Sequence, residues 1–138
     1  MCIRDRRMDR HETNGRAVAD FLDQNPGVQK VLYPGLTSHP GHELQMRQAS
    51  GFGALITFDL GTYERAKGLL DNLEVMSLAE SLGGVETLIS HPASMTHASV
   101  PAADRERLGI TEGVVRVSVG IEDLDDLIGD FESALAKI

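Results

Sequence analysis

One arginine stands in the middle of a run of β-branched residues near the end of the chain. The run is Val114-Val115-Arg116-Val117-Ser118-Val119. It predicts a strand whose side chains alternate between faces, so Arg116 shares a face with Val114 and Ser118. A guanidinium can grip a carboxylate through two parallel hydrogen bonds, which makes Arg116 a candidate anchor for a small acidic substrate. The strand alone favours a structural pair with an acidic residue, or a solvated strand face.

A second candidate is the glycine-rich segment Ala79-Glu80-Ser81-Leu82-Gly83-Gly84. Adjacent glycines permit a sharp turn or a close backbone approach to a ligand. Glu80 and Ser81 follow a predicted strand, where Glu80 would be placed to bind an amino group or to act in acid–base catalysis. The spacing alone favours an ordinary turn with an exposed carboxylate.

The histidines lack the spacing of a metal site. His39 and His42 are three residues apart, but His42-Glu43 is not followed by the second histidine that a zinc-binding helix needs. His91 and His97 fall in a predicted loop without cysteine partners. We therefore expect no metal ligands here and interpret these histidines as capping or surface residues.

Ten predicted elements position these residues, in the order α-β-α-β-α-β-β-α-β-α. Periodicity and turn residues predict helices over 8–25, 39–50, 62–73, 101–109 and from 123 onward. They predict strands over 28–33, 52–60, 74–79, 85–90 and 114–119. Thr62 and Asp123 are the expected N-caps of their helices. Interleaved strands and helices predict an α/β or α+β sandwich with helices against one sheet.

Length and composition describe one ordinary soluble domain. The chain has 138 residues, 41% hydrophobic and 25% charged, and aromatics make up only 4%, so we expect an aliphatic core. A net charge of -8 disfavours nucleic acid and membrane surfaces as partners. The single cysteine, Cys2, and the lack of an apolar leader favour the cytoplasm. Residues 1–7 are basic and irregular, and we interpret them as a scar or non-native tail before a domain over 8–138.

Three longer stretches cover nearly the whole chain after Met8. They are Tyr33-Pro34-Gly35-Leu36 with Ser38-His39-Pro40, His42-Glu43-Leu44 and Ser50-Gly51-Phe52-Gly53; Leu78 to Glu86 with His91-Pro92-Ala93-Ser94-Met95-Thr96-His97-Ala98; and Leu108-Gly109-Ile110-Thr111 leading into Val115 to Asp123. In order and spacing they resemble the C-terminal domain of the Cys/Met-metabolism enzymes that depend on pyridoxal 5'-phosphate (PLP), of the cystathionine γ-synthase and γ-lyase type.

The resemblance implies a fold and a set of site residues. The fold would be the small C-terminal domain of a fold-type-I PLP enzyme, with a largely antiparallel sheet and helices on one side. Arg116 would bind the substrate α-carboxylate, and Ser81 and the backbone around Leu82 would face the same group. Glu80 would meet the distal amino group of cystathionine, and Thr96 would lie behind them.

The resemblance also implies what the chain lacks. The family's PLP lysine sits in a Ser-x-Thr-Lys setting that none of Lys30, Lys67 and Lys137 matches. We therefore expect PLP to be bound by a missing N-terminal large domain, no catalytic residue in this chain, and no activity from the chain alone. The full-length enzyme, a homotetramer by resemblance, would act on cystathionine or homoserine esters by γ-replacement or γ-elimination.

Several alternatives remain open. Glu80 favours a γ-synthase or γ-lyase of transsulfuration over methionine γ-lyase, without separating the first two, and O-acetylhomoserine sulfhydrylase is a close relative. A free-standing module that binds an amino acid through Arg116 and the Ser81 turn is a second hypothesis. A third is a structural remnant that dimerises through an exposed face.

Overall fold

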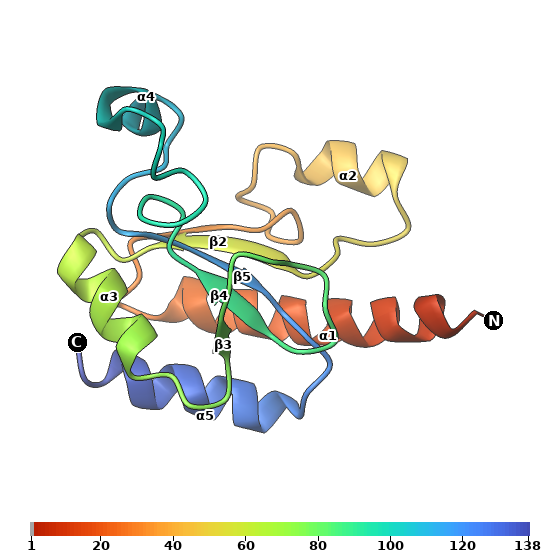
Figure 1. Ribbon diagram of the computed structural model, residues 1–138. Helices are drawn as coiled ribbons and strands as arrows, with labels where there is room; N and C mark the ends of the chain where they lie inside the picture. The colour runs from red at the N-terminus through yellow and green to blue at the C-terminus, as the bar shows by residue number, and fades with distance from the viewer. Residues whose placement is uncertain (1) are drawn as a thin grey trace.

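Figure 1 shows the computed structural model, which describes residues 2–138. The helices are α1 (Ile3–Gln24), α2 (His42–Gln48), α3 (Tyr63–Asp71), α4 (Ala102–Arg107) and α5 (Leu124–Leu135). The strands are β1 (Lys30–Leu32), β2 (Leu55–Asp59), β3 (Ser77–Leu78), β4 (Leu88–Ser90) and β5 (Val114–Ser118). Their order along the chain is the predicted one.

The strands form one sheet in the order β1-β2-β5-β4-β3. Every neighbouring pair is antiparallel except β3 and β4, which run parallel. The expectation of a largely antiparallel sheet is therefore confirmed. The central strand β5 carries Arg116, whose cross-strand neighbours are Thr57 on β2 and Ser90 on β4.

The two faces of the sheet differ in what covers them. Helices α1, α3 and α5 supply the buried helical residues and lie against one face, whereas α2 and α4, which bury no residue, lie toward the other (Figure 1). Val115, Val117 and Val119 enter the core under the helices. The alternation predicted for this strand is confirmed, because Arg116 faces away from that core.

The core is less purely aliphatic than the composition suggested. Tyr33, Phe58 and Phe131 are among its largest fully buried side chains. Phe131 on α5 meets Phe58 on β2 edge-on, with ring centroids 6.0 Å apart. Large rings bury much apolar area per side chain, so these three aromatic residues contribute strongly to the core.

The first helix begins earlier than predicted. It starts at Ile3, not at residue 8, and the carboxylate of Asp5 accepts a hydrogen bond from the backbone N–H of Cys2 at 3.2 Å. Arginine is a good helix former, so the basic residues at 4, 6 and 7 continue the helix although they bury nothing. Met1 lies outside the described residues, and the interpretation of residues 1–7 as non-native stays a prediction.

Caps were predicted better than strand ends. Thr62 Oγ1 accepts from the Arg65 N–H at 3.3 Å, and Asp123 Oδ1 from the Asp125 N–H at 2.9 Å, which confirms both N-caps. The strands are shorter than their apolar runs, most of all β3, because hydrophobic residues continue past the point where ladder hydrogen bonds end. In residues 2–138 no helix is both long and apolar enough to span a bilayer.

Candidate functional site

Arg116 stands half-buried in the middle of the sheet face that the core does not use. Its Nη2 donates to the backbone carbonyl of Glu80 at 3.0 Å. Among residues 2–138 no carboxylate forms an ion pair with it, so the structural pair considered from the sequence is absent there. Most of the five donors of the guanidinium therefore make no hydrogen bond within residues 2–138.

The glycine turn lies over the same strand. The Gly83 N–H donates to the Ser118 hydroxyl at 2.8 Å, and Gly83 has φ +78, a conformation that favours glycine. Together with the contact between Arg116 and the Glu80 carbonyl, this bond fastens the turn to β5 at two positions. The turn therefore presents Ser81 and Leu82 beside Arg116 on an open face, with both side chains exposed.

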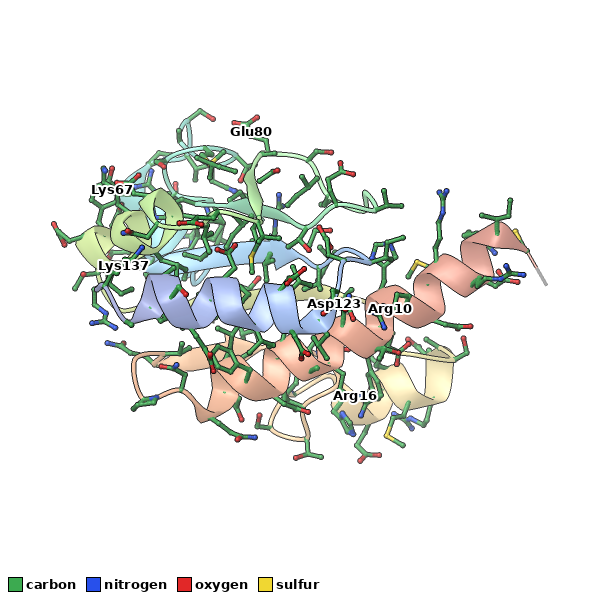
Figure 2. All side chains as sticks on the ribbon, turned by 90° about the horizontal axis from the view of Figure 1, so that it is seen from below. Arg10, Arg16, Lys67, Glu80, Asp123 and Lys137 are labelled. Carbon is green, nitrogen blue, oxygen red and sulfur yellow. The ribbon has the colours of Figure 1, made fainter. Side chains whose placement is uncertain are left out.

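The carboxylate of Glu80 is free to meet a ligand. The residue is exposed, and its carboxylate makes no hydrogen bond or ion pair with any residue in the described part of the chain. Figure 2 shows Glu80 away from α1 and α5, where the turn projects from the sheet. Glu80 is thus tied to Arg116 by its backbone carbonyl, while its carboxylate stays exposed and unpaired within the described residues.

A cavity of about 230 Å³ adjoins this turn. Leu82, Gly83 and Ser118 line it together with Leu55, the cross-strand partner of Ser118. Leu55 is 45% exposed and Leu82 49%, so the wall of the cavity is apolar and open. Apart from His11 and Ser118 its lining side chains are apolar, and a mainly apolar lining with a few polar groups is the usual composition of a small-molecule site.

Thr96 is not joined to this group by any polar contact. It is exposed, and its hydroxyl lies 2.7 Å from Nδ1 of the adjacent His97. The structure thus brings together Arg116, Glu80 and the Ser81–Leu82 turn, and leaves Thr96 on the loop that follows β4.

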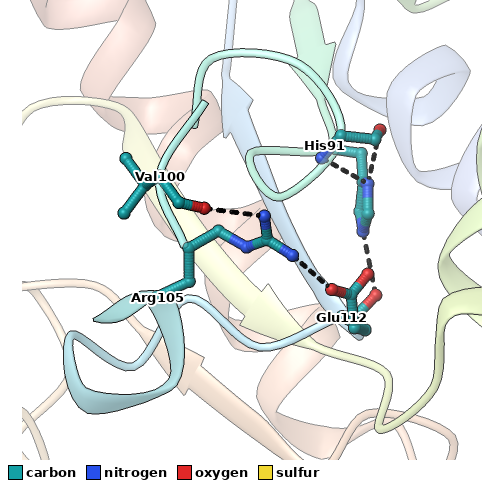
Figure 3. A network of polar contacts seen from close by, with 5 residues as sticks. His91, Val100, Arg105 and Glu112 are labelled. Carbon is teal, nitrogen blue, oxygen red and sulfur yellow. Dashed lines mark hydrogen bonds and ion pairs between the residues drawn. The ribbon is translucent and has the colours of Figure 1, made fainter. Parts of the chain in front are cut away.

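A network of polar contacts holds that loop in place, as Figure 3 shows. Arg105 donates to the Val100 carbonyl at 3.1 Å and to the Glu112 carboxylate at 2.7 Å. His91 Nε2 donates to the Glu112 carbonyl at 2.8 Å, so Nδ1 is left to accept from the Ser94 hydroxyl at 2.7 Å.

The interpretation of His91 as a surface residue is wrong, whereas a capping contact is present, because its Nδ1 lies 3.3 Å from the Ser94 N–H. The side chain is 3% exposed, and both ring nitrogens are used to tie the loop together. His39 is closer to the expectation, because its Nδ1 accepts from the N–H of Gly41, the N-cap of α2. Among the described residues, no three metal-binding side chains gather at one place.

Two supporting groups escaped the sequence analysis. Arg10, His11 and Asn14 on α1 each contact a backbone carbonyl in the segment that leaves β5, His11 at 2.7 Å from the Val119 oxygen. Asp130 on α5 accepts three backbone N–H groups ahead of β3. Only Asp130 left a signal, as a charged residue beside Phe131 in the apolar stripe of an amphipathic helix.

Fold and sequence together define the class of protein. The chain matches the family described as Cys/Met metabolism PLP-dependent enzyme over residues 5–136. It belongs to that family, and the resemblance inferred from its motifs is confirmed.

Similar proteins carry several activities within the family. Cystathionine γ-lyase of Bacillus subtilis is 52% identical over 132 residues, which are 96% of this chain and 35% of that protein. L-methionine γ-lyase of Fusobacterium nucleatum is 53% identical over 133 residues, 96% of this chain and 34% of that protein. The crystal structure of cystathionine γ-synthase from Xanthomonas oryzae pv. oryzae in complex with cystathionine superposes with a TM-score of 0.92 at 46% identity, covering 96% of this chain and 35% of that one. The chain thus spans about a third of the relatives it matches.

The family depends on PLP, but the residues described here do not fit that cofactor. Lys67 pairs with Asp71 on α3, and Figure 2 shows Lys67 and Lys137 at the end of the molecule where α3 and the C-terminus lie. Lys30 is on the edge strand β1, which β2 separates from β5 in the sheet. No lysine is carried by the strands and turn that surround Arg116, so no chemical step through PLP follows from this chain.

Proposed function

We propose that the chain is the substrate-binding part of a PLP-dependent transsulfuration enzyme that acts on cystathionine or homoserine esters by γ-elimination or γ-replacement. The observation that carries this proposal is Arg116, a cation without a carboxylate partner in residues 2–138, beside a turn held by Ser118. In the proposal Arg116 binds the substrate α-carboxylate and the Ser81–Leu82 turn lies against the same group. Glu80 binds the distal ammonium of cystathionine, and Thr96 supports the site from its loop.

The remainder of the enzyme supplies PLP, the chemical step and the cover for this face. In support, Leu55 and Leu82 are half exposed around an apolar cavity, as expected of a face built to be covered. In the proposal this cover is the family's large domain, within a homotetramer, and the isolated chain is inactive. The DNA upstream of Met8 tests this directly, because an open frame encoding Ser-x-Thr-Lys is required.

Substitution of Arg116 tests its role in the full-length enzyme. Arg116→Lys keeps the charge but loses the planar fork, so we expect KM for cystathionine to rise about 10- to 100-fold, as a lost charge-assisted pair of bonds implies. Arg47→Lys, on an exposed part of α2, is the matched control and should leave KM unchanged. An unaltered KM for Arg116→Lys would refute the assignment.

The same assay separates the activities within the family. The proteins similar to this chain include γ-lyases for cystathionine and for methionine and a γ-synthase. Glu80 leads us to expect cystathionine to be preferred to methionine, and adding cysteine to a homoserine ester would distinguish synthase from lyase.

Calorimetry of the isolated chain with cystathionine tests the free-standing module, which requires measurable heat.

A further inference from the structure

Ser90 is the nearest neighbour of Arg116 on β4. The antiparallel register of β4 and β5 pairs the two residues directly. Ile89 and Val117, the pair next along the ladder, both enter the core, so Ser90 and Arg116 share the opposite face. Residues paired in this way have Cβ atoms roughly 4.5–5.5 Å apart.

The Ser90 hydroxyl is buried without a partner. The residue is 1% exposed, and its Oγ makes no hydrogen bond to any atom of the described residues. Buried hydroxyls are nearly always bonded, since water is no longer there to replace the lost contact. Thr57, on the other side of Arg116, is half-buried and can reach solvent.

Arg116, in contrast, has hydrogen-bond donors without acceptors. Its Nη2 bonds the Glu80 carbonyl, and its other N–H groups make no bond within residues 2–138. A carboxylate held bidentately takes two donors, which leaves others unused. A buried acceptor without a donor thus lies beside a cation with donors to spare.

We propose that Ser90 is a positioning residue for Arg116, and this inference rests on the function proposed above. When a substrate carboxylate draws the guanidinium into its binding orientation, a free N–H of Arg116 donates to Ser90 Oγ. The hydroxyl then fixes the plane of the fork, and the bond missing in the free chain is made only in the bound state. A polar group left unsatisfied in a native core calls for an explanation, and a role at a functional site is one.

The test is Ser90→Ala in the full-length enzyme. We expect KM for cystathionine to rise about five- to tenfold, as the net loss of one hydrogen bond implies, with kcat within about twofold. Amide hydrogen exchange of β4 and β5 should be as slow as in the parent or slower, because the variant removes an unpaired buried hydroxyl. Ser90→Thr, which keeps the hydroxyl, should restore KM.

Three results would overturn the inference. The first is an unchanged KM in Ser90→Ala. The second is a loss of kcat in Ser90→Ala together with faster amide hydrogen exchange of β4, which would mark a structural role. The third is an equal rise in KM for the control Thr57→Val. Adding Ser90→Ala to Arg116→Lys should have no further effect if Ser90 acts through the fork. If Arg116→Lys leaves KM unchanged, the proposed function itself is refuted. If Arg116→Lys raises KM but Ser90→Ala leaves it unchanged, only the inference about Ser90 is refuted.

Discussion

The carboxylate of Asp130 anchors the chain segment that leads into β3 and the Glu80 turn. Its Oδ1 accepts the Glu74 N–H at 2.8 Å, and its Oδ2 accepts the N–H groups of Val75 and Met76, both at 3.0 Å. Asp130 is 7% exposed, so little water competes for these bonds. We predict that substitutions at this position destabilise the chain in a defined order.

The magnitudes follow from the exposure of the three donors. Glu74 and Val75 are exposed, so water can replace a lost bond at about 0.5 kcal/mol each, whereas the buried Met76 N–H would stay unpaired at about 2 kcal/mol. Asp130→Ala should therefore cost about 3 kcal/mol. Asp130→Asn can place its oxygen at the Oδ2 position and keep two bonds, so it should cost about 1 kcal/mol.

Urea unfolding of the 138-residue chain measures these differences. Glu132→Ala is the matched control, because it removes an exposed carboxylate from the same helix, and it should change the free energy of unfolding by less than about 0.5 kcal/mol. Hydrogen exchange should show residues 74–76 losing protection in Asp130→Ala. The reasoning is refuted if Asp130→Ala costs under about 1 kcal/mol, or if Asp130→Asn is equally damaging.

Two other predictions concern stability. An Ala Cβ at Gly120 would lie 2.3 Å from the Val85 carbonyl oxygen, whereas one at Gly129 in α5 would meet nothing within 4 Å. In urea unfolding, Gly120→Ala should therefore lower the free energy of unfolding by at least about 2 kcal/mol, and Gly129→Ala should raise it by about 0.5–1 kcal/mol. Similar values for both variants would contradict the predicted clash at Gly120. Burial raises the pKa of Tyr33 from 10.0 to about 12. The contribution of Tyr33 to the free energy of unfolding is therefore complete below pH 10.0 and is lost as pH rises through about 12. Tyr33→Phe, which loses the bond to the Gly53 carbonyl, should cost about 1 kcal/mol at neutral pH and weaken that alkaline loss, as urea midpoints across this range would show.

Local patterns predicted the elements and several of their details. The order of helices and strands, the two N-caps and the faces of β5 all depend on side chains within a few residues of one another, and all are confirmed. The motifs around Arg116 and Glu80 also sufficed to place the chain in its family. The burial of His91 could not be predicted, because it depends on Arg105 and Glu112, which approach only when the loop folds back.

The sequence by itself thus determined the fold class and the face of its strand on which Arg116 lies, since these follow from periodicity and residue type, and the resemblance of its motifs indicated the family. Only the tertiary structure decided what surrounds that arginine. Ser90 lies 26 residues away along the chain and meets Arg116 through the pairing of β4 with β5. The Glu80 carbonyl lies 36 residues away and follows β3, which pairs with β4. Such contacts are set by strand register and by the packing of helices from both ends of the chain, which no local pattern encodes.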